Sequence, residues 1–279
     1  MLGDTIMLST LKTNISIQYL IVGAGGTGGG GSPTNDRAGG GGGGGAVVTS
    51  TADFPTGTNL TVQVAPTSNG GSWTGASVRG PNGGDSIFHD ITAAGGGGGG
   101  SAQASGALNS NNHGRSGASG GGAGGIVSAL GGSATAGYAG GNMGASCCAS
   151  SGGGGAGGAG GTSSGSNTQG NGGPGVTNNI TGSNVTYGAG GHGEGGGTYD
   201  IAVAGTANRG NGGEGAGGDG NYSSGGLYNY QGAPGGSGIV ILRFTGATPT
   251  ISGGLTHSTS TVSGDTVISF TAGTGTITF

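Results

Sequence analysis

The chain has 279 residues, of which 83 are glycine, while charged residues make up 6% and aromatic residues 5%. So few apolar side chains cannot build a conventional hydrophobic core for this length, and glycine does not recur at every third position with abundant proline, which excludes collagen. The net charge of −4 argues against partners held by electrostatics, so we expect neither a nucleic-acid partner nor a membrane surface bound in this way.

The first predicted strand, residues 15–22, continues into GAGGTG at residues 23–28, which fits the G-x-G-x-x-G motif of dinucleotide-binding proteins. That motif requires a following helix, because the helix N-terminus holds the pyrophosphate. Residues 29–45 are mostly glycine instead, and each glycine costs a helix about 1 kcal/mol relative to alanine. We therefore expect no crossover helix and no dinucleotide site, although a second strand ends near Asp53, where a ribose-binding acid would lie.

The glycine residues are gathered into short tracts of similar length, which a disordered linker does not require. Such tracts can adopt the polyproline-II conformation, whose N–H and C=O groups must find partners outside their own segment. Without Cβ atoms, neighbouring tracts can approach closely and bond backbone to backbone. We expect the interrupting residues His192, Glu194, Glu214 and Asp219 to point outward. The tracts lie near 23–31, 39–45, 95–100, 120–125, 137–144, 152–161, 170–175, 188–197, 210–220 and 232–238.

The predicted fold class has little or no α-helix: a packed bundle of polyglycine-II helices closed by short β-strands, with a small β-rich C-terminal element. We assign residues 1–16 to an N-terminal attachment segment, 17–245 to the glycine-rich module and 246–279 to the C-terminal segment. Residues 237–244 are expected to pair with 15–22 and close the module.

Several spacers between the tracts contain β-branched or alternating residues that favour strands. In residues 86–93, alternation would place Ile87, His89 and Ile91 on one face of a single strand. In the tail, Gly264 and Asp265 form a plausible hairpin turn. The remaining spacers predicted to form strands or extended segments lie in residues 46–51, 59–65, 184–187 and 199–204.

The motifs that resemble catalytic or metal sites are incomplete. His192 and Glu194 imitate the H-x-E of zinc deaminases, but no P-C-x-x-C follows. His89 precedes Asp90 without a serine in a nucleophile-elbow setting. Cys147 and Cys148 are adjacent, a spacing that forms a disulfide only with strain, and two thiols do not complete a zinc site. We expect reduced thiols, no catalysis, no metal and no cofactor.

The opening YLIVGAGG, the glycine tracts with variable spacers and the closing GGSGIVILRF resemble the glycine-rich domains of tail-fibre and other virion proteins of tailed bacteriophages. The architecture is similar to that of phage tail-fibre adhesins built on packed polyglycine-II helices. The resemblance covers residues 17–245. It implies a rigid glycine scaffold whose tip loops contact a host receptor, with other virion or fibre subunits as further partners. It carries no individual contact residue, because those loops share no motif.

Aromatic and hydrogen-bonding residues on the spacers are the candidate receptor contacts, since rigid aromatic faces bind at low entropic cost. The same residues could instead cap the ends of the lattice. The sequence has no predicted signal peptide or membrane span, and we expect a virion location or, alternatively, an extracellular surface filament. The candidates are Trp73, His113, Arg115, Tyr222, Tyr228 and Tyr230.

Two main functions remain open at this level. One is a virion adhesin that binds a host-surface protein loop or glycan. The other is a purely structural fibre, spike or surface-filament subunit without a receptor-binding role. Another binding role such as ice binding is disfavoured, because the spacers are irregular and give no flat repeated face.

Overall fold

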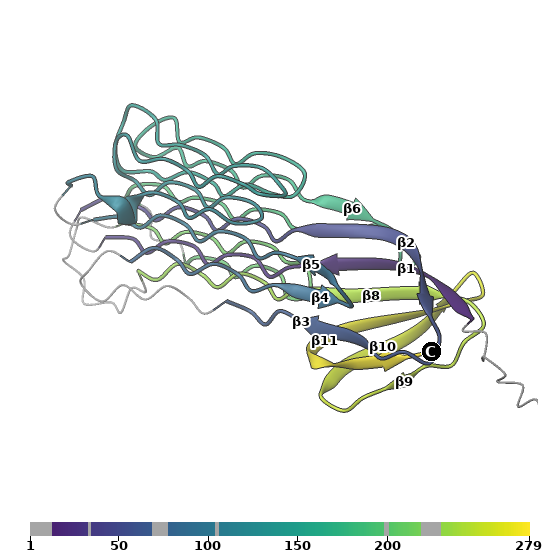
Figure 1. The fold of residues 1–279 in the computed structure, drawn as a ribbon. Helices are drawn as coiled ribbons and strands as arrows, with labels where there is room; N and C mark the ends of the chain where they lie inside the picture. Colours follow the sequence, from purple (N-terminus) through teal and green to yellow (C-terminus); the bar gives the residue numbers. More distant parts are fainter. Residues whose placement is uncertain (1–12, 33–34, 69–77, 104–105, 198–200, 219–229) are drawn as a thin grey trace, which may run out of the picture.

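A computed structural model describes residues 13–32, 35–68, 78–103, 106–197, 201–218 and 230–279. A β-sheet occupies one end of the molecule, and long extended segments run from it side by side (Figure 1). The described residues contain no α-helix and one 3-10 turn, η1 (Ser110–Asn112), which confirms the expected scarcity of helix. The strands are β1 (Asn14–Val22), β2 (Val47–Pro55), β3 (Leu60–Val64), β4 (Ser86–Phe88), β5 (Ile91–Ala93), β6 (Val176–Asn178), β7 (Val185–Tyr187), β8 (Ile239–Phe244), β9 (Thr250–Ile251), β10 (Leu255–Val262) and β11 (Asp265–Thr278).

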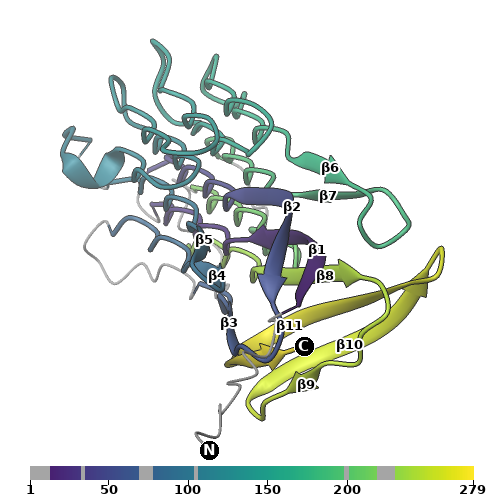
Figure 2. The same ribbon diagram turned by 45° about the vertical axis from the view of Figure 1, so that its right-hand side comes forward.

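The main sheet has the strand order β2-β1-β8-β11-β3-β4-β5, and β9 and β10 pair with β11. Its edge strands β2 and β5 also contact each other, so the sheet is nearly closed and barrel-like. The expected pairing of residues 15–22 with 237–244 is confirmed, because β1 and β8 are antiparallel neighbours with Gln18 opposite Arg243. The C-terminal β11 pairs with both β8 and β3, and its hairpin with β10 extends away from the glycine segments (Figure 2).

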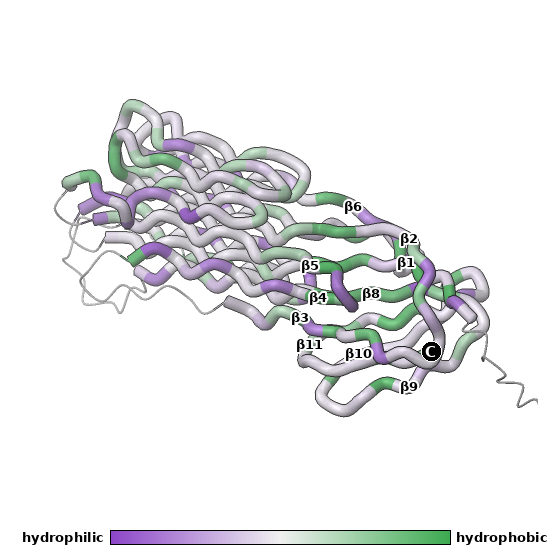
Figure 3. Tube along the Cα trace, in the orientation of Figure 1, coloured by the Kyte–Doolittle hydropathy of each residue, from purple (hydrophilic) through white to green (hydrophobic). Residues whose placement is uncertain are grey.

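Both faces of β1 are buried from Tyr19 to Val22, which explains the continuous apolar run in this part of the strand. Ile17, Tyr19 and Ile21 belong to the main core cluster inside the curled sheet. Leu20 and Val22, on the opposite face, pack in a second cluster with residues of β7 and β8. Apolar residues are concentrated along the strands, whereas most of the glycine region has intermediate hydropathy (Figure 3). The conventional core is therefore confined largely to the sheet.

Backbone hydrogen bonds between segments organise the glycine region with a period of three residues. Successive amides of residues 23–31 donate in rotation to three different neighbouring segments, and their carbonyl groups accept from two more. The amides of Gly23, Gly26 and Gly29 donate to Ala46, Gly43 and Gly40, and those of Ala24 and Thr27 donate to Gly84 and Pro81. The amides of Gly25, Gly28 and Gly31 donate to Gly236, Ala233 and Tyr230. The carbonyl groups of Ala24 and Gly26 accept from the amides of Gly96 and Gly213. One segment is thus surrounded by hydrogen-bonded neighbours on every side.

The close approach of these segments requires glycine. A Cβ atom built on Gly26 would overlap the carbonyl of Gly97, and one built on Gly97 would overlap the carbonyl of Arg115. At most of the described glycines between residues 23 and 238, a Cβ would overlap a neighbouring backbone atom in the same way. Backbone pairing therefore takes the place of side-chain packing here. GAGGTG at residues 23–28 belongs to this lattice, and no α-helix occurs among the described residues that follow it.

The prediction of one strand over residues 86–93 was wrong. The structure forms a hairpin in which β4 and β5 pair, with Phe88 opposite Ile91 and the turn at His89 and Asp90. His89 has φ of 56° and is exposed, whereas Phe88 is fully buried. Histidine and aspartate adopt the left-handed region more readily than most residues, so this pair suits a tight turn. Because the chain reverses direction at His89 and Asp90, the alternation of side chains between the two faces of one strand does not continue across this turn.

Two further local predictions need correction. The final hairpin turns at Ser263 and Gly264, both with positive φ, so Asp265 already begins β11 and forms an ion pair with Arg243 at 2.8 Å. Glu194 is buried rather than outward-facing, because its backbone is bonded to Ser150 inside the lattice.

Candidate binding surface

The loops farthest from the sheet form the candidate binding surface. Residues 23–31 leave β1, and the segment ending at Ala46 returns to β2, so residues 32 and 35–38, at the other ends of these segments, lie far from the sheet (Figure 1). η1 lies at that same end of the molecule (Figure 1). The surface is therefore built from connections between glycine segments, whose lengths and side chains can vary without disturbing the lattice.

His113 follows η1 directly, and hydrogen bonds fix both the turn and the histidine ring. Asn109 caps the turn, accepting from Asn111 N at 2.9 Å, while its own amide donates to the Asn112 side chain at 2.7 Å. The His113 Nδ1 accepts from the backbone N–H of Leu130 at 2.8 Å, which fixes the imidazole as an acceptor at this nitrogen. The ring remains partly exposed.

Tyr230 lies at the same end as His113, whereas Arg115 lies nearer the middle of the lattice. The Tyr230 carbonyl accepts from the amide of Gly31, the last residue of the first segment, at 3.0 Å. The Arg115 amide donates to Gly98 O at 2.8 Å, well inside the segment that leaves β5. The structure thus does not gather all of the predicted contact residues into one site. Trp73, Tyr222 and Tyr228 lie outside the described residues.

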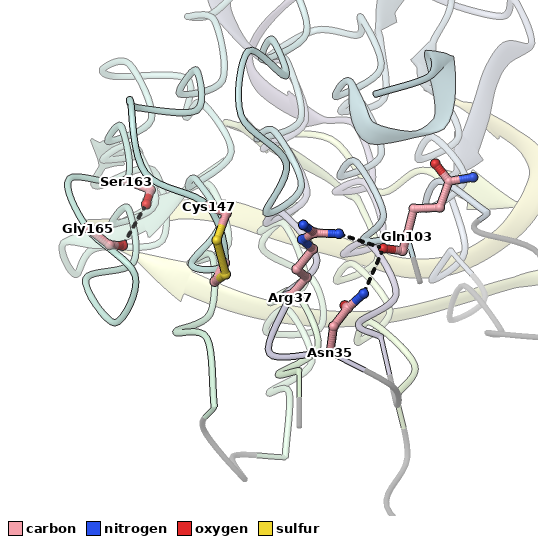
Figure 4. Close-up of a disulfide and its surroundings, with 7 residues drawn as sticks. Asn35, Arg37, Gln103, Cys147, Ser163 and Gly165 are labelled. Atoms are coloured by element: carbon pink, nitrogen blue, oxygen red, sulfur yellow. Dashed lines mark hydrogen bonds between the residues drawn. A yellow bond between two sulfur atoms is a disulfide. The ribbon is translucent and has the colours of Figure 1, made fainter. Parts of the chain in front are cut away.

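A polar clamp that the sequence analysis missed joins two of the far loops (Figure 4). Asn35 Nδ2 and Arg37 Nη1 both donate to the backbone carbonyl of Gln103, each at 3.3 Å. The Gln103 side chain accepts from Asn109 Nδ2 at 2.8 Å, which connects the clamp to η1. The polar run NDR at residues 35–37, between two glycine tracts, was the available signal.

The expectation of two reduced thiols was wrong, because Cys147 and Cys148 form a disulfide in the structure (Figure 4). Cys148 has φ of 99°. Its amide donates to Gly125 O at 3.2 Å and its carbonyl accepts from Ala38 N at 2.8 Å. Bonds to two neighbouring segments therefore hold the backbone at this residue, a constraint that cannot be read from the adjacent cysteines alone.

The potential metal-ligating side chains are scattered over the described residues. No three His, Cys, Asp or Glu side chains within them are grouped so that they could hold a metal ion. An open pocket of about 340 Å³ lies at the start of β1. Its lining, formed by Asn14, Ile15, Ser16, Thr56, Thr245, Gly246 and Ala247, carries amide and hydroxyl groups but no titratable side chain. None of the described helical structure is long and apolar enough to cross a membrane.

Comparison with known proteins gives one match. A family model described as a glycine-rich domain matches residues 5–245, which contain the whole glycine lattice together with β1 to β8. No curated protein matches the chain, and no solved structure matches it. The match covers most of the sequence, and the chain belongs to the glycine-rich domain family.

Proposed function

We propose that this protein is a virion adhesin of a tailed bacteriophage, in which a rigid bundle of polyglycine-II helices displays variable loops to a receptor on the host surface. The observation that carries the proposal is the backbone lattice itself. Its stability resides in main-chain bonds, so the sequences of its end loops are free to diverge.

The three-residue period supports the assignment of polyglycine-II helices. A polyproline-II helix has three residues per turn and no internal hydrogen bonds. Gly26, Gly29 and the residues between them bond only outward, in directions that repeat every third residue. Glycine is needed wherever a Cβ would meet a neighbouring carbonyl, which accounts for the abundance of this residue.

The arrangement of the loops supports a display function. The sheet anchors one end of the lattice, and the far end carries His113, Tyr230 and the Asn35–Arg37–Gln103 clamp. Partly exposed aromatic and hydrogen-bonding groups of this kind suit recognition of a protein loop or a glycan. The fixed ring of His113 and the clamped loops would lose little conformational entropy on binding.

A structural subunit is the second candidate, favoured by the edge strand β10. This strand pairs only with β11 among the described strands, and its residues Thr256–Thr261 are exposed. An unpaired strand edge can add a strand from another chain and thereby join subunits.

Attachment to cells distinguishes the two functions. We expect the labelled full chain to bind at least one strain of a bacterial panel, measured by flow cytometry. The double substitution His113→Ala with Tyr230→Ala should lower attachment about tenfold or more, because hot-spot contacts are few and often aromatic. Tyr138→Ala is the matched control, because it also removes a half-exposed aromatic ring. The Tyr138 amide donates to Gly155 O, which places this residue away from the candidate surface.

Equal attachment by all variants would contradict these contacts, and absence of attachment to every strain would contradict the adhesin. Assembly of the chain into filaments without cell binding would support the structural subunit. Circular dichroism and thermal melting of each variant check that any loss is not caused by unfolding.

A further inference from the structure

Two arginines from separate spacers are placed on adjacent segments of the lattice. The amide of Gly80, directly after Arg79, donates to Gly99 O at 2.9 Å, and the amide of Arg115 donates to Gly98 O at 2.8 Å. Residues 80–83 and 115–118 are both antiparallel to residues 95–100, so they run in the same direction. The two arginines therefore lie close together, although 36 positions separate them in the sequence, 115 minus 79.

A direct contact joins the two arginine-bearing segments. Asn82 Nδ2 donates to the backbone carbonyl of Ser116 at 2.9 Å. The hydroxyl of Ser116 lies 2.7 Å from that of Ser133 on the next segment. Asn82, Ser116 and Ser133 are exposed, so the segments that carry the two arginines, and the segment next to them, also present amide and hydroxyl groups at the surface.

Neither guanidinium has a partner among the residues that the structure describes. The Nε atoms of Arg79 and Arg115 are buried and make no hydrogen bond. Each of the other arginines of the described chain has at least one side-chain partner, although the Nε atom of Arg37 also makes no hydrogen bond. Arg243 pairs with Asp265 at 2.8 Å, Arg209 lies over the ring of Tyr187 at 5.2 Å, and Arg37 donates to Gln103 O.

The electrostatic environment of this pair is unfavourable without an anion. Partial burial, and then the neighbouring charge of Arg115, lower the pKa of Arg79 from its ordinary value. The chain has ten acidic residues against six basic ones, yet two of those six lie together without a carboxylate between them in the described structure. A bound anion would relieve both the repulsion and the unmet hydrogen bonds.

We propose that Arg79 and Arg115 form a binding site for an oxyanion, a carboxylate or phosphate group carried by a surface glycan. Guanidinium groups bind both anions through paired hydrogen bonds of fixed geometry. Asn82, Ser116 and Ser133 would contact the neutral hydroxyls of the adjoining sugars. The identification of the anion carrier as a host glycan rests on the proposed adhesin function, whereas the anion site itself does not.

Isothermal titration calorimetry on the full chain tests the site with inorganic phosphate, trigalacturonate and the neutral trisaccharide maltotriose. We expect phosphate and trigalacturonate to bind and maltotriose not to bind. Arg79→Gln or Arg115→Gln should weaken binding about tenfold or more, and the double variant should abolish it. Arg209→Gln is the matched control, because it removes one guanidinium elsewhere on the lattice, and should change the affinity less than about twofold.

The relative affinities of phosphate and trigalacturonate show which anion the site prefers. No binding of either anion by the wild-type chain, unchanged binding by the double variant, or an equal loss in Arg209→Gln would overturn the proposal. Should a variant lose its native melting transition, the Arg79→Lys and Arg115→Lys variants replace it. They keep the charge but lose the paired geometry, and weaker binding by these folded variants is then the expected result.

Cell attachment separates this inference from the proposed function. Anion binding without attachment to any strain would keep the site and contradict the adhesin. The opposite outcome has two parts: the wild type binds no anion, and the Arg79→Gln, Arg115→Gln double variant still attaches to cells at full strength. This outcome would keep the adhesin function and contradict the anion site.

Discussion

Gly97→Val is expected to lower the free energy of unfolding by about 3–5 kcal/mol, a far larger effect than most single substitutions produce. Gly97 accepts from Gly43 N at 2.7 Å and donates to Ser119 O at 2.8 Å, and its Cβ would overlap Arg115 O. The valine must push these segments apart, which both strains the packing and leaves buried backbone groups unpaired. Urea denaturation followed by circular dichroism measures the change.

Gly253→Val is the matched control for this substitution. Gly253 lies in a turn before β10, its φ is not positive, and a Cβ there would meet no heavy atom within 4 Å. We expect its unfolding free energy to stay within about 0.5 kcal/mol of the wild type. Equal stability of the two variants would mean that residues 95–100 are not closely packed, and Gly155→Val repeats the test at a second place in the lattice.

Phe88→Ala is expected to cost about 3–5 kcal/mol, for a different physical reason. Phe88 is fully buried in the curled sheet, and its ring lies 5.1 Å from that of Phe54 and 6.0 Å from that of Tyr19. Truncation removes these contacts and leaves a cavity that neighbouring strands cannot fill without moving. Because β1 leads directly into the first glycine segment, we expect the sheet and the lattice to unfold in one transition at lower urea concentration.

Tyr138→Ala serves as the control for the loss of a ring, since Tyr138 is half exposed. Its unfolding midpoint should change little. If Phe88→Ala produced two separate transitions, with the glycine region melting at its original midpoint, the sheet would not be required to hold the lattice together.

The sequence allowed the outline of the fold to be predicted where local patterns dominate. The apolar runs of β1 and β8 predicted strands, and their positions at the two ends of the glycine tracts predicted their pairing. The bunching of glycine predicted close backbone contact, because only glycine permits it. These inferences depend on residue type alone and not on which segments become neighbours.

The details that failed depend on tertiary neighbours. Glu194 is buried because Ser150, 44 positions away, bonds to its backbone. His89 occupies a turn because Phe88 and Ile91 pair across it, which overrides the alternation of Ile87, His89 and Ile91. The candidate contacts His113 and Arg115 are two positions apart in the sequence. His113 nevertheless lies at the far end beside η1, whereas the Arg115 amide donates to Gly98 O, nearer the sheet.

Hydrogen–deuterium exchange of the glycine amides, followed by NMR, tests the central claim that a backbone lattice replaces the hydrophobic core. The amides of Gly26, Gly43 and Gly97 donate to Gly43 O, Gly97 O and Ser119 O at 2.9, 2.7 and 2.8 Å. They should therefore exchange as slowly as the amides of β1 and β8, through opening of the whole structure. Exchange of these amides at the rate of an unstructured glycine peptide, while the strands stay protected, would contradict the lattice.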